Sequence, residues 1–377
     1  MAFIRKFAKR ICIIANLVVV ALFLLACANS FLDPGRWWII SLLGLVFPLL
    51  LVLVTGFGLF WLFFYSRRLS LISAVALVIG WPNIHTFFAF NLPRKFVEQK
   101  PAGTLRVLTW NVRRWDEFIT KKAGASGHRI KMIDFLQQQD ADIMCFQEFF
   151  EPHNARGFSE NISYIQQQLG YPYYFFSHDY KAGNGMFETG VIIFSKFPII
   201  YSEQIKYNSP DYIRGSESLI FADLDVNGKT IRVFTTHLQS VLFRNKDFRD
   251  FEIIRNVDDS MIEASKSIAK KLKRAYSLRS SQADLVRAEL DRSPYPLVMC
   301  GDFNDVPNSY AYFRIRGNRR DAFSEKGFGI GRTYVHLSPT LRIDYILTDQ
   351  QFKVAQVGKF PLPYSDHHPL VADLQLP

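Results

Sequence analysis

The sequence has few cysteines, and their positions exclude several classes of protein. The four are Cys12, Cys27, Cys145 and Cys300. None has the spacing of a zinc site, and no disulfide framework is implied. Two lie in an apolar run and two at the ends of predicted core strands, so we expect buried, inert thiols.

Acidic residues are scarce in the first hundred positions. Residues 1–100 contain ten Lys or Arg and two acids, a net charge of +8, which leaves only +3 of the total of +11 for residues 101–377. The basic composition therefore comes mostly from the N-terminal region. It is poor evidence for nucleic-acid binding.

Long apolar runs fill the region that lacks acids. They extend over residues 11–28, 37–65 and 69–90, and the last is interrupted by Trp81-Pro82-Asn83. Each is about long enough to span a bilayer as a helix. Three in succession favour membrane helices over buried soluble ones. We therefore predict a membrane region at 1–92 with about three transmembrane helices, and the lipid bilayer as a partner.

Basic residues around these runs indicate an orientation. They cluster at residues 5–10 and at Arg67-Arg68, whereas the first loop carries only Arg36. Cytoplasmic loops are enriched in Lys and Arg, so we expect the N-terminus and the second loop inside. This predicts a multi-pass protein of a bacterial inner membrane with an extracytoplasmic, periplasmic C-terminal domain. Leu24-Leu25-Ala26-Cys27 also resembles a lipoprotein cleavage site, and lipidation of Cys27 is an alternative with the same orientation.

A change of pattern marks the C-terminal domain, predicted at 104–377 after a linker at 93–103. Strands are predicted at 105–111, 142–147, 190–195, 218–225, 230–237, 297–300, 341–348 and 370–376, and helices around 130–136 and 158–169. The Asn227-Gly228 pair between two strands is a strong hairpin signal. Many strands, several joined by hairpins, with helices between them predict two packed sheets covered by helices.

Residues 241–293 interrupt this alternation with a long polar insert that is predicted to be helical. Five basic residues gather in it between Lys266 and Arg274. We expect a solvated helix face. A lid, or a surface that meets anionic lipid headgroups, is the alternative.

Polar residues stand where predicted strands end, at positions that an apolar core would not select. They are Asn111, Glu148, His237, Asp302, Asn304, Asp344 and the segment Ser365-Asp366-His367-His368. Asp302 and Asn304 would lie on one face if their strand continues through both. Asp344 lies inside an apolar strand, where a carboxylate is costly to bury unless a partner such as a histidine is present.

These residue types suit the hydrolysis of a phosphate ester. The reaction needs a cation or donors for the phosphoryl oxygens, a base for water and stabilisation of the leaving group. Mg²⁺ prefers hard oxygen ligands and keeps several waters, so one or two carboxylates suffice, and Glu148 and Asp366 are candidates. A histidine oriented by a carboxylate, such as His367 with Asp344, is a suitable acid–base group.

The residues from about Thr104 to Leu376 resemble the endonuclease/exonuclease/phosphatase superfamily. These metal-dependent phosphoesterases include DNase I-like nucleases, neutral sphingomyelinases and inositol-polyphosphate phosphatases. The matching stretches are Thr109-Trp110-Asn111-Val112, Gln147-Glu148, Gly190-Val191-Ile192-Ile193-Phe194-Ser195-Lys196, Thr236-His237-Leu238, Gly301-Asp302-Phe303-Asn304, Arg342-Ile343-Asp344-Tyr345 and Ser365-Asp366-His367-His368-Pro369. Their order and spacing match over nearly the whole C-terminal domain.

The resemblance implies an α/β (α+β) fold, a four-layer α/β/β/α sandwich of the DNase I-like type, here preceded by transmembrane helices. It also implies a metal site. Glu148 would be the main metal ligand, with Asn111 close by and Asp366 contributing to the metal region.

The resemblance implies catalytic roles as well. Asp302 and Asn304 would position the attacking water and the phosphate. His367, paired with Asp344, would act in acid–base catalysis or phosphate stabilisation. His237 matches the DNase I and sphingomyelinase type, and Glu188 is expected to be the acid that supports it.

We therefore expect a membrane-anchored, Mg²⁺-dependent phosphoesterase, with Mn²⁺ as a substitute ion. Its substrate would be a phosphodiester, in a nucleic acid or a phospholipid, attacked by water with assistance from the metal. The alternatives are a phosphomonoesterase for inositol-type phosphates and a catalytically silent, membrane-bound binding module. Retention of every matched polar position favours an enzyme. No obligate protein partner is evident.

Overall fold

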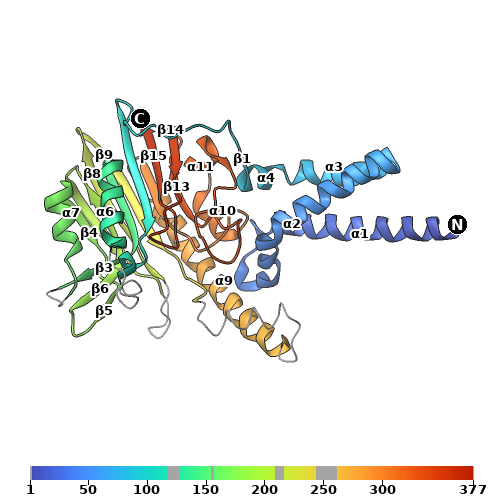
Figure 1. Ribbon diagram of the computed structural model, residues 1–377, viewed down its shortest axis with the longest axis horizontal. Coiled ribbons are helices and arrows are strands. Elements are labelled where there is room, and N and C mark those ends of the chain that lie inside the picture. Colours follow the sequence, from blue (N-terminus) through green and yellow to red (C-terminus); the bar gives the residue numbers. More distant parts are fainter. Residues whose placement is uncertain (1, 118–126, 154–156, 209–215, 243–260, 377) are drawn as a thin grey trace.

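The computed structural model describes residues 2–117, 127–153, 157–208, 216–242 and 261–376. An elongated group of helices extends from one side of a sandwich of two sheets (Figure 1). These helices are α1 (Ala2–Ala28), α2 (Pro34–Phe64), α3 (Arg67–Ile79) and α4 (Trp81–Phe87). We call residues 2–87 the N-terminal helical unit.

The N-terminal helical unit contains two helices, α1 and α2, that are long and apolar enough to cross a membrane. A third span is present if α3 and α4, which are bent by 63° at their junction, count as one. Pro82 lies in the first turn of α4. Proline starts a helix readily but does not continue one, so the third apolar run breaks at this point.

An apolar cluster holds the N-terminal helical unit together. Phe23 of α1, Phe47 of α2 and Ala76 of α3 are buried in it, and the rings of Phe23 and Phe47 stack with centroids 5.5 Å apart. Large apolar side chains on the outer faces, such as Leu49 and Val52, are exposed. A unit that is apolar both inside and outside suits a lipid environment better than water.

Two sheets form the sandwich. The first contains β2 (Thr104–Asn111), β3 (Ile143–Pro152), β4 (Tyr173–Phe176), β5 (Tyr180–Ala182), β6 (Phe187–Ser195), β14 (Lys353–Lys359) and β15 (Leu370–Gln375). Its order is β14-β15-β2-β3-β6-β4, and β5 pairs with β6. The second contains β7 (Ile199–Ile205), β8 (Glu217–Val226), β9 (Lys229–His237), β10 (Leu297–Asp302), β11 (Arg320–Asp321) and β13 (Asp344–Thr348). Its order is β11-β13-β10-β9-β8-β7.

Short elements complete the described chain. A separate two-stranded pair joins β1 (Ala89–Phe90) to β12 (Phe328–Gly329). The turn η1 (Arg113–Asp116) follows β2, and α11 (Ala322–Lys326) follows β11.

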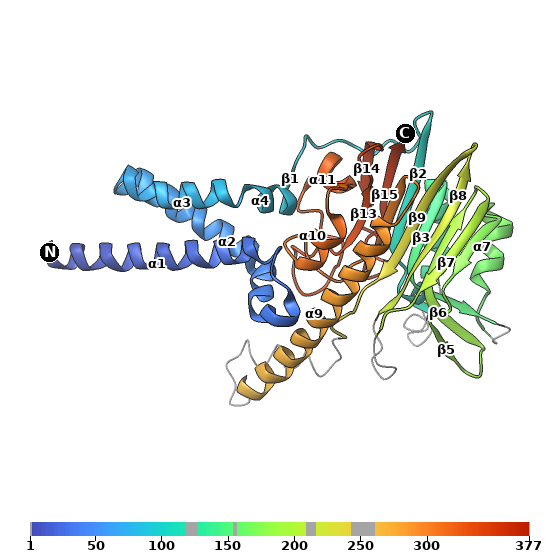
Figure 2. The same ribbon diagram turned by 180° about the vertical axis from the view of Figure 1, so that it is seen from behind.

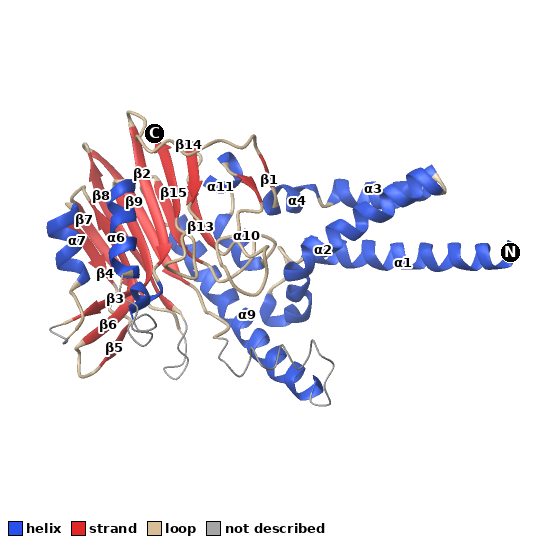
Figure 3. Ribbon diagram, in the orientation of Figure 1, coloured by secondary structure: helices blue, strands red, loops and turns tan. Residues whose placement is uncertain are grey.

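Alternating side chains in each strand build the layers. In β2, Leu105 and Val107 face the core between the sheets, whereas Leu108 and Trp110 face outward. The outer face of the first sheet packs under α6 (His128–Gln139) and α7 (Asn161–Leu169). The outer face of the second packs under α9 (Met261–Asp291) and α10 (Tyr310–Arg316). The predicted four-layer sandwich is therefore confirmed (Figures 1 and 3).

The structure contains the predicted hairpin, and most of the cysteine thiols are buried. Asn227 and Gly228 have φ of 55° and 84°, as a tight hairpin turn requires, and join β8 to β9. All four cysteines are free, and Cys27, Cys145 and Cys300 are buried as predicted. Cys12 is only partly buried.

Several edge strands are not predicted from the sequence pattern. The structure also describes only part of the polar insert. The edge strands β4, β7 and β14 bury one face weakly, so their apolar alternation is faint. Residues 243–260 of the insert lie outside the described residues. The described part is α9, whose second half packs on the sheet. Its first half exposes Lys266, Lys270 and Lys273, as expected for a solvated face.

The segment between the N-terminal helical unit and the first sheet is packed rather than free. The buried guanidinium of Arg106 forms an ion pair with Asp373, with 2.7 Å between Nε and Oδ1. It also donates to the backbone oxygens of Glu98 and Val97. These contacts attach the 93–103 segment to the sandwich.

Candidate active site

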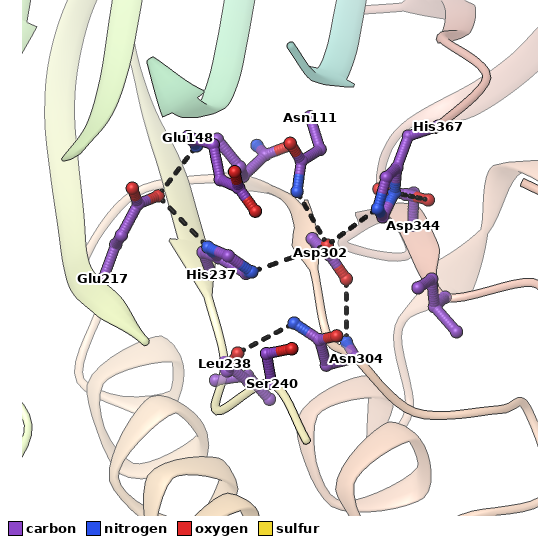
Figure 4. A network of polar contacts seen from close by, with 12 residues as sticks. Asn111, Glu148, Glu217, His237, Leu238, Ser240, Asp302, Asn304, Asp344 and His367 are labelled. Carbon is purple, nitrogen blue, oxygen red and sulfur yellow. Dashed lines mark hydrogen bonds and ion pairs between the residues drawn. The ribbon is translucent and has the colours of Figure 1, made fainter. Parts of the chain in front are cut away.

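The polar residues of the strands converge at the carboxyl ends of β2, β9 and β10 and beside the middle of β3, which continues to Pro152 rather than ending at Glu148 as expected. β10 runs parallel to β9, with Asp302 opposite His237, and β2 runs parallel to β3, with Asn111 opposite Gln147. Parallel strands end at the same edge of a sheet. Because the two sheets face each other, Asn111 Nδ2 donates to Asp302 Oδ2 across the sandwich at 3.0 Å (Figure 4).

Asp302 lies at the centre of the site. It is 1% exposed, and its Oδ2 is 3.6 Å from His237 Nε2 and 3.7 Å from His367 Nε2. Burial and the nearby Asp344 raise the pKa of this carboxyl, and the two imidazoles oppose that shift. A buried carboxylate needs such cationic partners to remain ionised.

The backbone around Asp302 is tightly constrained. Gly301 has φ of 151°, and a Cβ there would lie 2.4 Å from the carbonyl oxygen of Thr236. Only glycine lets β9 and β10 approach this closely. The strand ends at Asp302, so the condition under which Asp302 and Asn304 would lie on one face of it is not met. Asn304 instead has φ of 50° and donates its N–H to Asp302 Oδ1 at 2.8 Å.

The predicted pair of His367 and Asp344 is present. His367 Nδ1 lies 3.1 and 3.0 Å from the two carboxylate oxygens of Asp344, and both side chains are buried. Burial alone would lower the pKa of His367, but Asp344 and Asp302 raise it to about 10. A cationic imidazole therefore offsets the cost of burying these two acids.

His237 has a similar arrangement on the other side of Asp302, with an acid that the sequence analysis did not identify. Its Nδ1 lies 3.2 Å from Glu217 Oε2. Burial opposes protonation, but Glu217 and Asp302 raise the pKa of His237 to about 9. The same Glu217 oxygen accepts the backbone N–H of Glu148 at 2.9 Å.

Glu188, expected to support His237, lies elsewhere. Its Oε2 lies 3.0 Å from His153 Nε2 and 2.6 Å from His178 Nδ1, and its Oε1 is 2.8 Å from Lys181 Nζ. The expected contact with His237 is therefore wrong, because strand pairing places Glu217 opposite that histidine. The hairpin register alone does not predict this contact: counting back from the Asn227-Gly228 turn puts Ser218 opposite His237, and a register shift between Glu217 and Ile220 puts Glu217 there instead.

Glu148 owes its direction to an irregularity in β3. The register with β6 shifts between Phe146 and Phe149, and Glu148 has φ of 48°. Such bulges turn a side chain away from the regular alternation. Its side chain is 30% exposed, and its carboxylate points toward the group formed by His237, Asn111 and Asp302 (Figure 4).

Asp366 adjoins His367 in sequence but makes a different contact. Its Oδ2 is 3.4 Å from Arg113 Nε. It lines a second hollow of about 410 Å³ together with Arg113 and His368. Its contribution to a metal site remains a prediction.

The donor set fits a hard divalent cation. Glu148 offers a carboxylate, and Asn111 offers an amide oxygen that accepts the Arg113 N–H at 3.0 Å and keeps a second lone pair. Oxygen ligands of this kind suit Mg²⁺. Asp302, Asp344 and His367 also offer ligand atoms within 4.8 Å of one another. In that group Asp344 already contacts His367 Nδ1, which favours an acid–base pair over a set of ligands.

A cavity of about 310 Å³ borders the site on the side of Glu148 and His237. Its wall is aromatic and apolar with two cations at its margin: Phe150, Tyr180, Phe187, Leu242, Arg114 and Lys181. A substrate group of moderate size can occupy it beside a phosphate held near Asp302.

The fold and the site together define a class. A four-layer sandwich with two carboxylate-oriented histidines and hard oxygen donors at one edge is an arrangement for phosphate ester hydrolysis. Residues 108–367 match the family model of the Endonuclease/Exonuclease/phosphatase family. The chain therefore belongs to this family, and it is a hydrolase of phosphate ester bonds. A second family model, described as a domain of unknown function (DUF8431), matches residues 9–87.

Solved structures with the same fold include several family members. An endonuclease/exonuclease/phosphatase from Beutenbergia cavernae is 18% identical with a TM-score of 0.51, over 74% of this chain and 72% of that one. A family protein from Leptotrichia buccalis is 15% identical with a TM-score of 0.49, over 72% and 100%. The human nocturnin catalytic domain with bound sulfate is 16% identical with a TM-score of 0.48, over 73% and 96%. No curated protein matches the chain.

Proposed function

We propose that the chain is a membrane-anchored, Mg²⁺-dependent phosphodiesterase whose catalytic domain lies outside the cytoplasm. One observation carries the proposal. Asp302 stands between two imidazoles, each fixed at Nδ1 by a buried carboxylate, beside the oxygen donors Glu148 and Asn111. This arrangement offers a base, two cationic donors and hard ligands within one space.

The proposed mechanism gives each group one role. Asp302, with its raised pKa, accepts a proton from the attacking water. His237 and His367 present Nε2 on either side of Asp302, and as imidazolium ions they donate to phosphoryl oxygens. Asn304 fixes Asp302 through its backbone N–H. Mg²⁺ held by Glu148 and Asn111, with Asp366 contributing, would neutralise charge on the phosphate.

Two features support the extracytoplasmic orientation. The N-terminus and the Arg67-Arg68 turn lie at the same end of the N-terminal helical unit, where Lys9 Nζ is 4.8 Å from the ring centroid of Tyr65. The sandwich adjoins the opposite end (Figure 1). Basic ends are retained in the cytoplasm, so the sandwich would be on the other side.

The membrane anchor favours a phospholipid diester over a nucleic acid. The exposed Lys266, Lys270 and Lys273 lie on α9, which extends on the same side of the sandwich as the N-terminal helical unit (Figure 2). They can meet anionic headgroups near the bilayer. Nucleic acid is the second candidate, because the cations Arg114 and Lys181 border the cavity beside Glu148.

A substrate panel on the purified full chain tests the proposal. Sphingomyelin, phosphatidylinositol, plasmid DNA, RNA and inositol phosphates are compared with Mg²⁺, Mn²⁺ and EDTA. We expect diester cleavage that EDTA abolishes and that Glu148→Ala with His367→Ala removes. Activity retained in that double variant would exclude the mechanism. Turnover of inositol phosphates alone would indicate a phosphomonoesterase, and no metal-dependent turnover would indicate a binding module.

A further inference from the structure

The N-terminal helical unit contacts the sandwich at the segments that carry the catalytic residues. A membrane anchor requires only a linker, and here the chain has one at 93–103. Three separate polar contacts exist in addition. Two reach segments within a few residues of Asp302 or Asp344, and the third reaches α9, whose Arg279 contacts the loops after Asp302 and His237.

The first contact holds the loop that follows Asp302. Asn308 is 1% exposed. Its backbone oxygen accepts from Asn29 Nδ2 at 2.9 Å, and its Oδ1 accepts from Asn83 Nδ2 at 3.3 Å. Gly44 of α2 packs against the same residue, since a Cβ there would lie 2.8 Å from the Asn308 oxygen. Three parts of the N-terminal helical unit therefore converge on one loop residue.

The second contact lies just before Asp344. The buried guanidinium of Arg342 donates from Nη2 to the backbone oxygen of Thr86 in α4 at 2.8 Å. Its Nη1 donates to Asp321 at 2.6 Å. The hydroxyl of Tyr345 lies 2.7 Å from the backbone oxygen of Arg342 and 2.9 Å from that of Asp305, and its single proton is shared between these two acceptors. The segment before Asp344 is thereby linked to the loop after Asp302.

The third contact acts through α9. Ser280 Oγ donates to Asp33 Oδ1, the residue that caps α2, at 2.6 Å. The adjacent Arg279 is buried and donates from Nε to Asp305 at 3.1 Å and from Nη1 to the backbone oxygen of Gln239 at 2.9 Å. One guanidinium thus joins the loop after Asp302 to the loop after His237.

From these contacts we infer that the N-terminal helical unit is a positioning element of the active site as well as an anchor. This inference rests on the proposed function for its effect on catalysis. Asn29 and Asn83 set the position of the 302–309 loop and, through it, the carboxylate of Asp302. A displacement of about 1 Å at a reacting group costs up to about a hundredfold in rate. The turnover number therefore depends on how the unit is seated.

The test uses the full chain in detergent micelles, with bis(p-nitrophenyl) phosphate as the probe substrate. The double variant Asn29→Ala with Asn83→Ala removes both donors to Asn308 and leaves every catalytic residue in place. Ser73→Ala is the matched control, because it removes a buried hydrogen bond to Asn16 inside the same unit, 3.0 Å long, without touching the sandwich. We expect kcat of the double variant to fall at least about tenfold with KM within about twofold.

A second readout does not depend on activity. Amide hydrogen exchange in the 302–309 peptide should rise in the double variant and stay at the wild-type level in Ser73→Ala. Unchanged exchange and unchanged kcat in the double variant would overturn the inference. Absence of turnover in the wild-type chain would instead contradict the proposed function, while the exchange comparison still decides the inference.

A third variant guards against a folding defect. If the double variant does not fold, Asn83→Ala alone is measured in the same way, because Asn29 then still holds the Asn308 backbone. Arg342→Lys should also lower kcat, since a lysine can keep the ion pair with Asp321 but cannot reach Thr86 as well. Full activity in a folded Arg342→Lys variant would show that the contact of Arg342 with Thr86 does not position the active site.

Discussion

The two histidines that flank Asp302 make similar contacts with its carboxylate, but the acids that orient them make different further contacts. His237 and His367 each place Nε2 within 3.7 Å of the same carboxylate oxygen, and each has Nδ1 against a buried acid. Both carboxylate oxygens of Asp344 lie within hydrogen-bond distance of His367 Nδ1. Glu217 uses one oxygen on both His237 and the backbone N–H of Glu148.

This difference divides the site into two halves. On the side of His367, the acid orients an imidazole only. On the side of His237, one acid joins the imidazole to the strand irregularity that directs Glu148, the proposed metal ligand. The His237 half should therefore respond to the metal, and the His367 half should not.

The largest expected effect comes from removing an imidazole. His367→Asn should lower kcat by about 10²–10⁴-fold, the usual range for a positioned acid–base group. The dependence of its residual activity on Mg²⁺ concentration should remain that of the wild type. Steady-state kinetics over a Mg²⁺ series measure both quantities. A folded His367→Asn variant with near wild-type turnover would remove this residue from catalysis.

The two supporting acids give the sharper test of the division. Glu217→Gln should raise the Mg²⁺ concentration for half-maximal activity by about 10–100-fold, as loss of a group that supports a metal ligand does. Asp344→Asn should lower kcat and leave that concentration unchanged. Equal Mg²⁺ requirements in the two variants would abolish the distinction between the halves.

The sequence predicts most of this site because the family motifs lie at strand ends. Asn111, Asp302 and His237 come together once β2, β9 and β10 are recognised as parallel neighbours of their partners. The succession of strands, hairpins and helices predicts two packed sheets covered by helices, and the family resemblance implies the four-layer sandwich. The cost of a buried acid predicts that Asp344 has a partner such as a histidine, and the family resemblance implies that the partner is His367.

The remainder depends on backbone detail that no motif records. Glu148 points into the site because β3 has an irregular register, and Asn304 turns back because its φ is positive. Glu217 belongs to no motif, and it lies opposite His237 only because the register of β8 and β9 shifts between Glu217 and Ile220. The contacts of Asn29 and Asn83 with Asn308 join residues more than 200 positions apart, so local pattern carries no sign of them.

A smaller effect should arise from the close approach of β9 and β10. In Gly301→Ala the new Cβ meets the Thr236 oxygen, next to His237. We expect the free energy of unfolding to fall by about 1–3 kcal/mol, the range for overpacked positions. We also expect kcat to fall, because the displaced Thr236 adjoins His237. Gly103→Ala is the control, because its φ is also positive but nothing lies within 4 Å. Equal losses of stability in the two variants, measured by urea unfolding, would show that backbone strain alone acts.

The smallest effect is expected at Glu188. The family resemblance assigns this acid to His237, whereas the structure places Glu217 beside that histidine. Glu188 contacts His153, His178 and Lys181, and burial, which raises its pKa, is outweighed by these cations, which lower it to about 2. Glu188→Gln should leave kcat and the Mg²⁺ requirement within about twofold of the wild type, since this buried carboxylate contacts none of the groups assigned to catalysis or to the metal. Glu217→Gln, assayed beside it, should change the Mg²⁺ requirement strongly. If Glu188→Gln raised the Mg²⁺ requirement as much as Glu217→Gln, Glu188 would have to support His237 indirectly, through the paired strands β5 and β6. The contact of Glu217 with both His237 and Glu148 would then no longer distinguish the two halves of the site.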